Sequence, residues 1–291
     1  MSFGTASWGV RSWGFPQPSS SSVVTVQFDA TSTSPYSAAL STYSWNHITG
    51  SQTNRLLVVS VSLFLTGTVS SITYGGVALT NHPTATIVNG NYRSEIWYLV
   101  APASGTGSIV VTLSASLTSI GSAESYNNVH QLTPIEATAT ASGIGVTASA
   151  TVTTKAKNSV VLANLVASSA SGVASAAGQT SRQINSGALG TDADADKGPI
   201  TPAAATTLSW TGLGAADTWA VSAISLRSAN VLNGLILKNG RFEQVKLGDE
   251  GLYRAAYLSA GRIQASTAPT KPLILSNGRV KESISTDNVV I

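Results

Sequence analysis

The strongest constraint on the fold is a series of short apolar segments in which side chains alternate with a period of two. The segment Arg55–Leu65, "RLLVVSVSLFL", places five large apolar side chains on one side of an extended chain and two serines on the other. Period two is the side-chain repeat of a β-strand, and no long window shows the 3.6-residue repeat of an amphipathic helix. The sequence therefore predicts an all-β protein.

Turn signals separate these segments at short intervals. Gly75-Gly76 interrupts "SITYGGVALT", and Asn89-Gly90 lies between two apolar runs, where it favours a type I′ turn. Many short strands joined by tight turns are typical of an antiparallel β-sandwich. We predict one jelly-roll-like antiparallel β-sandwich over residues 22–228. Its outer faces should be polar but uncharged, because only 10% of the residues are charged.

The distribution of charge marks a boundary near residues 228–233. Residues 1–230 contain eight basic and eight acidic residues, whereas the last 61 residues contain eight basic and five acidic ones, so the net charge of +3 lies there. This small excess is mixed with acidic residues, which favours a solvated β-surface over a surface that binds nucleic acid. We therefore divide the chain into an extended N-terminal arm (1–21), the sandwich (22–228) and a small C-terminal β-hairpin module (229–291).

One short phrase occurs three times in the C-terminal module. Its copies are "LILKNGRFEQV", "AYLSAGRIQAS" and "KPLILSNGRVKES", each with an arginine directly after the glycine. The residues at the turns are Asn239, Gly240 and Arg241, then Ala260, Gly261 and Arg262, then Asn277, Gly278 and Arg279. Because Asn-Gly accepts the positive φ angles of a two-residue turn, the phrase predicts one β-hairpin used three times. A module of about 60 residues buries little surface, so we expect it to act in anchoring or in oligomerisation, as a homotrimer.

The N-terminal arm contains a small repeat of its own. Trp8 and Trp13 each lie in the sequence "SWG", within a stretch rich in glycine, serine and proline that has no strand periodicity. An indole is costly to leave in water, and this segment cannot build a core around it. The two tryptophans therefore either pack back onto the sandwich or insert into a partner, and the arm is a candidate partner-binding element.

Composition removes several kinds of chemistry. The chain has no cysteine and only three histidines, His47, His82 and His130, which we interpret as ordinary surface or strand residues. No apolar run reaches the roughly 18 residues of a membrane helix, so we expect no membrane insertion. The first thirty residues lack the basic and apolar regions of a signal peptide, so we do not expect export by that route.

The segment "GTDADADKG" spaces Asp192, Asp194 and Asp196 as a calcium loop does. An EF-hand loop would continue with Gly and Glu where this chain has Lys197 and Ala203. We therefore expect a polar loop and no metal site, with weak calcium binding as the alternative.

The carboxylates of the sandwich do not form a recognisable catalytic pair. Glu95 lies two residues from Trp97 and Asp217 lies two residues from Trp219, and neither has an evident second carboxylate. No Gly-x-Ser-x-Gly elbow with a suitable histidine and no phosphate-binding glycine loop is present. We expect a protein without enzymatic activity and without a cofactor.

Aromatic side chains on a β-surface can stack on sugar rings, although most strand aromatics belong to the core. The two that we single out as glycan-stacking candidates are Trp97 and Trp219. The other strand aromatics considered are Tyr74, Tyr92, Tyr98 and Trp210.

The phrases of the sandwich follow one another in a familiar order. "NRLLVVSVSL", "VSSITYGGVALT", "EIWYLVAPASGTGSIVVTLS", "NNVHQLTPIEA", "NSVVLANLVA" and "DTWAVSAISL" together resemble a widespread β-sandwich family of phage and bacterial surface proteins. The resemblance covers most of residues 50–227 and implies a jelly-roll-like fold, but no catalytic residues. "KPLILSNGRVKESISTDN" is similar to short repeats in phage virion and tail-fibre proteins.

These observations together predict a non-enzymatic structural component of a phage virion. The expected role is that of a capsid decoration or cement protein, or a head fibre, with the major capsid protein or tail proteins as partners. Its expected location is the virion, assembled in the host cytoplasm. The alternative is a receptor- or glycan-binding module of a tail fibre or cell-surface appendage, which would bind a host-surface glycan.

Overall fold

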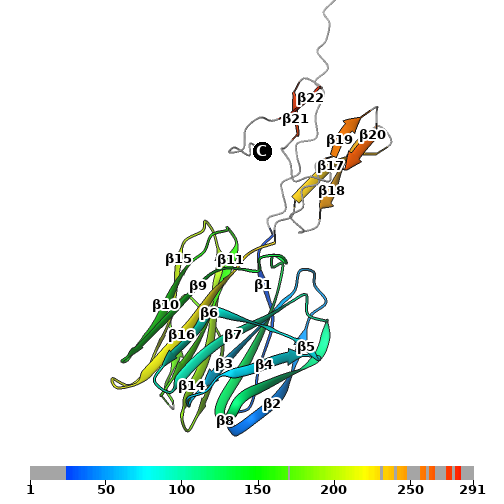
Figure 1. Ribbon diagram of the computed structural model, residues 1–291. Helices are drawn as coiled ribbons and strands as arrows, with labels where there is room; N and C mark the ends of the chain where they lie inside the picture. The colour runs from blue at the N-terminus through cyan, green and yellow to red at the C-terminus, as the bar shows by residue number, and fades with distance from the viewer. Residues whose placement is uncertain are drawn as a thin grey trace, which may run out of the picture.

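The computed structural model describes residues 24–169 and 171–229, here called the body, and six strands between residues 232 and 282 (Figure 1). Every regular element among these residues is a β-strand, and the strands pair antiparallel. No helix capable of crossing a bilayer occurs in this part of the chain. The all-β, antiparallel prediction is confirmed.

The first half of the body forms one eight-stranded sheet, the large sheet. Its strands are β1 (Gln27–Thr33), β2 (Ser37–Thr49), β3 (Leu56–Leu63), β4 (Val69–Tyr74), β5 (Val77–Ala78), β6 (Thr80–Asn89), β7 (Tyr92–Val100) and β8 (Gly105–Asn127). The long strand β8 pairs with β2 and β4 through its first half and with β1 and β3 through its second half. The sheet therefore curls into a nearly closed, barrel-like form.

The second half of the body forms two smaller sheets. The middle sheet has the order β13-β14-β11-β16-β9, and the small sheet has the order β10-β15-β12. Their strands are β9 (Ile135–Ile144), β10 (Ala148–Thr153), β11 (Ser159–Ala167), β12 (Ala174–Ser175), β13 (Thr180–Gly187), β14 (Gly190–Ile200), β15 (Ala205–Thr211) and β16 (Thr218–Leu226). The body thus has three sheets where a simple sandwich has two.

Each half of the body has its own apolar core. The large sheet encloses one, which includes Leu57, Val59, Leu63, Ile72 and Ile109. The second lies between the middle and small sheets and includes Val161, Leu165, Leu208, Trp210 and Val221. The period-two prediction for Arg55–Leu65 is confirmed, because alternate residues of β3 face the first core. The remaining residues of β3 are buried as well, since the middle sheet covers them.

The expected polar loop at residues 190–198 is wrong. These residues belong to β14, and Asp192, Asp194 and Asp196 are buried where β14 faces the large sheet. The intervening Ala193 and Ala195 point the other way, into the core beneath the small sheet. The segment therefore has strand periodicity, but its polar face is an interior one, so alternating aspartates alone do not indicate a loop.

Two predicted turns can be compared with the structure. Gly75-Gly76 joins β4 to β5 with φ angles of 55° and 84°, and Tyr74 pairs with Val77 across it, as expected. In the next hairpin Asn89 pairs with Tyr92, so the turn residues are Gly90 and Asn91, one position later than predicted.

Each C-terminal repeat forms a two-stranded antiparallel hairpin. The strands are β17 (Leu232–Lys238), β18 (Arg241–Leu247), β19 (Ala256–Ser259), β20 (Arg262–Ala265), β21 (Leu273–Ser276) and β22 (Arg279–Glu282). The innermost pairs are Lys238 with Arg241, Ser259 with Arg262, and Ser276 with Arg279, so each arginine begins a return strand. The turn residues at 239–240, 260–261 and 277–278, and the arm with Trp8 and Trp13, lie outside the described residues. The trimer stays a prediction.

The body is entered and left at one end (Figure 1). Near its start, the amide of Val26 donates a hydrogen bond to the carbonyl of Asn158, at 3.4 Å. Near its finish, the hydroxyl of Ser228 donates to the carbonyl of Lys157 at 2.9 Å, and the amide of Ala229 donates to the carbonyl of Asn128 at 2.7 Å. The first and last described residues of the body therefore both lie beside the turn between β10 and β11.

Candidate functional site

The two tryptophans chosen as glycan-stacking candidates are differently placed. Trp97 is 8% exposed, lies in the core of the large sheet and donates its Nε1 hydrogen to Glu95 Oε2 at 3.1 Å. Trp219 is partly buried, and its ring lies so close to β9 that a Cβ atom on Gly143 would sit 2.7 Å from it. The ring of Trp97 is therefore not presented to a ligand, and one side of Trp219 is covered.

Glu95, the carboxylate nearest to Trp97, is held in place by hydrogen bonds from neighbouring strands. Its Oε1 accepts hydrogen bonds from Arg93 Nε at 2.5 Å and from the amide of Val69 at 3.2 Å. Its Oε2 accepts from the indole of Trp97 and, at 3.4 Å, from Asn81. The side chain joins β4, β6 and β7 inside the large sheet.

The three aspartates of β14 are the centre of a buried polar layer between the large and middle sheets. Asp192 accepts hydrogen bonds from Ser62 Oγ at 2.5 Å, Asn164 Nδ2 at 2.6 Å and Gln183 Nε2 at 2.5 Å. Asp194 accepts from Ser122 Oγ at 2.5 Å and also from Gln183 Nε2 at 2.6 Å. The donors come from both sheets, so these carboxyl groups connect the two halves of the body.

One cation and one further carboxyl group complete this layer. Arg182 Nε donates to Asp196 Oδ2 at 2.8 Å, and the Tyr126 hydroxyl donates to the same oxygen at 2.9 Å. Glu124 extends from β8 and is fully buried, and its Oε2 has no hydrogen-bond partner among the residues described. Within the described part of the chain no group of three or more histidine or acidic residues is arranged to hold a metal ion.

Burial sets the protonation of this layer. It raises the pKa of Glu124 well above its ordinary value, and the nearby Asp194, Asp192 and Asp196 carboxylates raise it further. Burial likewise raises the pKa of Asp192, with the charge of Asp194 adding to it, and burial raises the pKa of Asp194. A charged group is costly to bury without a partner, so these carboxyl groups bind protons more tightly in the folded state than in the unfolded chain. Proton binding in this layer is therefore coupled to folding.

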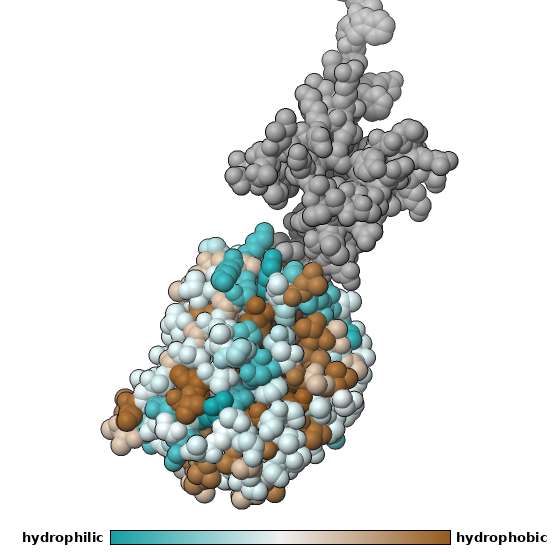
Figure 2. All heavy atoms as spheres, in the orientation of Figure 1, coloured by the Kyte–Doolittle hydropathy of each residue, from teal (hydrophilic) through white to brown (hydrophobic). Residues whose placement is uncertain are grey.

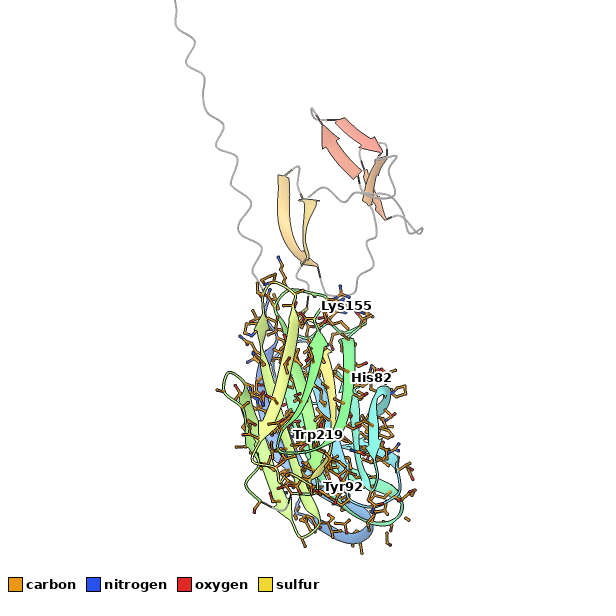
Figure 3. All side chains as sticks on the ribbon, turned by 90° about the vertical axis from the view of Figure 1, so that its left-hand side faces the viewer. His82, Tyr92, Lys155 and Trp219 are labelled. Atoms are coloured by element: carbon orange, nitrogen blue, oxygen red, sulfur yellow. The ribbon has the colours of Figure 1, made fainter. Side chains whose placement is uncertain are left out.

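The best candidate for a ligand site lies on the surface, where one edge of each sheet meets the others. Strand β6 is an edge of the large sheet, β9 of the middle sheet and β10 of the small sheet. Together they border an open groove of about 560 Å³. Figure 3 shows two of its residues, His82 and Lys155, on one face of the body. The lining residues are His82, Thr84, Ile135, Glu136, Ala137, Thr138, Thr151, Thr153 and Lys155.

A bulge in β6 forms one wall of this groove. Asn81 pairs with Trp97 and Thr86 pairs with Glu95, so four residues of β6 stand opposite a single residue of β7. The extra length carries Thr84 across to β9, where its hydroxyl lies 3.0 Å from that of Thr138. Proline at position 83 fits this arrangement, because it cannot donate a ladder hydrogen bond.

Glu136 has a fixed position in the groove. Its Oε1 accepts three hydrogen bonds, from the amide of Lys155 at 3.1 Å, Ser159 Oγ at 2.7 Å and Ser225 Oγ at 3.0 Å. Within residues 24–229 no hydrogen bond reaches its Oε2. A carboxylate held through one oxygen by three donors is pre-oriented, and its second oxygen can accept from a ligand.

The remaining polar groups of the groove are a histidine, a lysine and several hydroxyls. Burial lowers the pKa of His82 from its ordinary value, so the imidazole is neutral at pH 7. Its Nδ1 lies 3.2 Å from the hydroxyl of Thr84. Lys155 and Thr153 are exposed on the opposite wall. The groove thus combines one fixed acceptor, one ammonium donor and several groups that both donate and accept.

Comparison with known proteins found no match: no protein-family model, no curated protein and no solved structure corresponds to this chain. The groove is therefore identified as a candidate ligand site from its geometry alone. Sequence reasoning missed the groove, because its residues come from three sheets and are not grouped in the sequence. Proline in an apparent strand was the one signal that could have indicated the bulge.

Proposed function

We propose that this protein is a non-enzymatic structural component of a phage virion, a capsid decoration or cement protein or a head fibre. The observation that carries the proposal is that both terminal segments join the body at the same end, beside Asn158 and Asn128. A domain attached there by its arm or its hairpin module projects its opposite end away from the attachment surface. We also propose that the body is related to the jelly-roll-like β-sandwich appendages that the sequence resembles.

The packing of the body suits a projecting role. Both faces of β3 are buried, one inside the curled large sheet and the other against the middle sheet. Both faces of β11 are buried between the large and small sheets. Strands of nine residues such as β11 and β16 span about 30 Å, so the far turns stand well clear of the attachment end. Figure 2 shows apolar residues on the visible face of the body as separate patches among residues of intermediate hydropathy.

The hairpin module suits attachment or assembly. Each repeat forms a separate two-stranded sheet, with pairing described only inside the hairpin. Isolated hairpins are marginal in water, so they need further contacts. We propose that these contacts come from the major capsid protein or tail proteins of the particle, and from the other chains of a homotrimer.

The test is the protein composition of gradient-purified particles from the source culture. We expect peptides of this chain to co-sediment with the major capsid protein at the abundance of a structural component, as measured by quantitative mass spectrometry. Recovery of the chain only in the unsedimented fraction of a lysate that contains particles would contradict the proposal.

The second candidate function is that of a receptor- or glycan-binding module. It no longer depends on Trp97, which is buried. The groove between β6, β9 and β10 favours it instead, because a pre-oriented carboxylate and several hydroxyl groups line it.

A further inference from the structure

We infer that the groove between β6, β9 and β10 binds a neutral saccharide, with Glu136 and Lys155 as its principal contacts. The inference specifies the ligand of the second candidate function and is independent of the first. It starts from Glu136, whose Oε1 is occupied by three donors from the protein while its Oε2 faces no described partner. Such an oxygen accepts hydrogen bonds from ligand hydroxyls at little entropic cost, because the side chain is already ordered.

The other walls supply the complementary donors. The Lys155 side chain, exposed on the rim, provides an ammonium group. Thr151 and Thr153 alternate along β10, so both hydroxyls lie on the exposed side of that strand. Across the groove, the neutral imidazole of His82 and the hydroxyl of Thr84 form the second polar wall. Sugar hydroxyls donate and accept at once, and this mixture of groups matches them.

The groove also has the size and the apolar component that a sugar requires. Its volume of about 560 Å³ falls in the range of small-ligand sites. Ile135 and Ala137 also pack against interior cores, but both contribute to the lining on either side of Glu136, and the threonine methyl groups add to the apolar area. The C–H face of one or a few pyranose rings can pack against these groups while the ring hydroxyls contact the polar ones.

Other ligand classes fit this groove less well. A phosphate or nucleic acid would meet the Glu136 carboxylate, with Lys155 as the one cation of the lining, because burial keeps His82 neutral. A peptide strand added to the edge of β6 would meet Pro83 and the bulge, which interrupt the row of backbone donors. A lipid would bury threonine hydroxyls and a carboxylate against hydrocarbon, which is costly.

The experiment uses the purified full-length chain on an array of neutral and charged glycans, followed by calorimetric titration of each neutral saccharide that binds. The decisive variant is Glu136→Gln. Its amide oxygen can keep the three protein donors, while its NH₂ group replaces the ligand-facing acceptor by a donor. We expect affinity to fall about ten-fold or more, as for the loss of a hydrogen bond to a charged group.

A matched pair of lysine variants controls for folding and for non-specific charge. Lys155→Met should also weaken binding about ten-fold. Lys157→Met, which alters an exposed lysine outside the lining, should leave it unchanged. Circular dichroism melting of all three variants verifies that they fold. The inference is overturned if no neutral saccharide binds, or if the saccharide that binds does so with equal affinity to wild type, Glu136→Gln and Lys155→Met. Neither result would bear on the composition of the particles.

Discussion

The two faces of strand β3 lie in very different surroundings. On one face Leu57, Val59 and Leu63 pack into the apolar core of the large sheet. On the other face Leu56 and Val58 pack against the middle sheet, and Ser60 and Ser62 lie in the polar layer, opposite the aspartates of β14. Both sets of side chains are fully buried. The same strand thus contributes to an interior stabilised by burial of apolar surface and to one stabilised by hydrogen bonds.

The contrast between the apolar and the polar face of β3 explains how the two halves of the body are aligned. Apolar packing depends mainly on volume, so several alignments of two apolar faces have similar energies. A buried polar group tolerates only the alignment that supplies its partners, because an unmade hydrogen bond is costly there. Asn164 illustrates this: its Nδ2 donates to Asp192 at 2.6 Å, and its Oδ1 accepts from Ser94 on the large sheet at 2.5 Å. The polar layer therefore specifies the register between the large and middle sheets.

The largest expected effect is in the apolar core. Truncation of the fully buried Leu57 to alanine should lower the free energy of unfolding by about 2–5 kcal/mol, through lost transfer energy and the cavity that remains. The measurement is urea denaturation followed by tryptophan fluorescence. Leu132→Ala is the matched control, because Leu132 is 62% exposed and its loss should change stability by less than about 0.5 kcal/mol. Equal effects of the two substitutions would mean that Leu57 is not in a packed core.

A slightly smaller effect is expected for Asn164→Ala in the polar layer. This change removes few apolar contacts but leaves the Asp192 carboxyl and the Ser94 hydroxyl each without one partner, at a cost of about 3 kcal/mol in total. The same urea titration measures it. A loss of less than about 1 kcal/mol would show that water replaces the missing amide, and the layer would then not specify the register.

The two interiors should also differ in their response to pH. The raised pKa values of Glu124, Asp192 and Asp194 mean that the folded state keeps protons that the unfolded chain releases above about pH 4. Their stabilising contribution is present below the ordinary carboxyl range and is lost as pH rises towards the raised values. The Glu124→Gln variant should therefore lose less stability than wild type as pH rises above about 4, where the unfolded carboxyl group ionises.

The comparison of wild type with Glu124→Gln also controls for the other groups that titrate. Burial lowers the pKa of His47 to about 4, so His47 favours the folded state above about pH 6.5 and opposes it below, in both proteins. The difference between wild type and Glu124→Gln cancels this contribution. Leu57→Ala should keep the wild-type pH slope, because it touches only the apolar core. An identical slope for wild type and Glu124→Gln would contradict the raised pKa of Glu124 in the folded state.

The smallest effect is expected for Ser222→Ala, at the periphery of the polar layer. The hydroxyl of this residue makes one long hydrogen bond, 3.3 Å, to the carbonyl of Ser94. Its removal should cost about 1 kcal/mol or less, which distinguishes single contacts from the network around Asn164. Thermal melting of Ser222→Ala and Asn164→Ala in the same buffer makes the comparison. A loss as large as that of Asn164→Ala would show that stability in the layer does not follow the number of hydrogen bonds.

The sequence predicts those parts of the molecule that depend on local pattern. Strand β3, the Gly75-Gly76 turn and the three C-terminal hairpins follow from alternation and turn chemistry within ten or so residues. Strand β14 does not, because its aspartates are buried only when the large sheet covers them. The groove does not either, because Glu136 obtains its donors from residues 155, 159 and 225, which meet through tertiary packing.

Immunogold labelling of particles from the source culture, with antibody raised against residues 22–228, tests directly whether this body is carried on a virion. We expect gold on the particle surface, since a body held at one end exposes its far turns to antibody. Label on heads would identify a decoration or head-fibre protein, and label on tails would identify a tail appendage and favour the saccharide-binding role. Unlabelled particles beside free, antibody-reactive protein would contradict the claim that this body is carried on a virion.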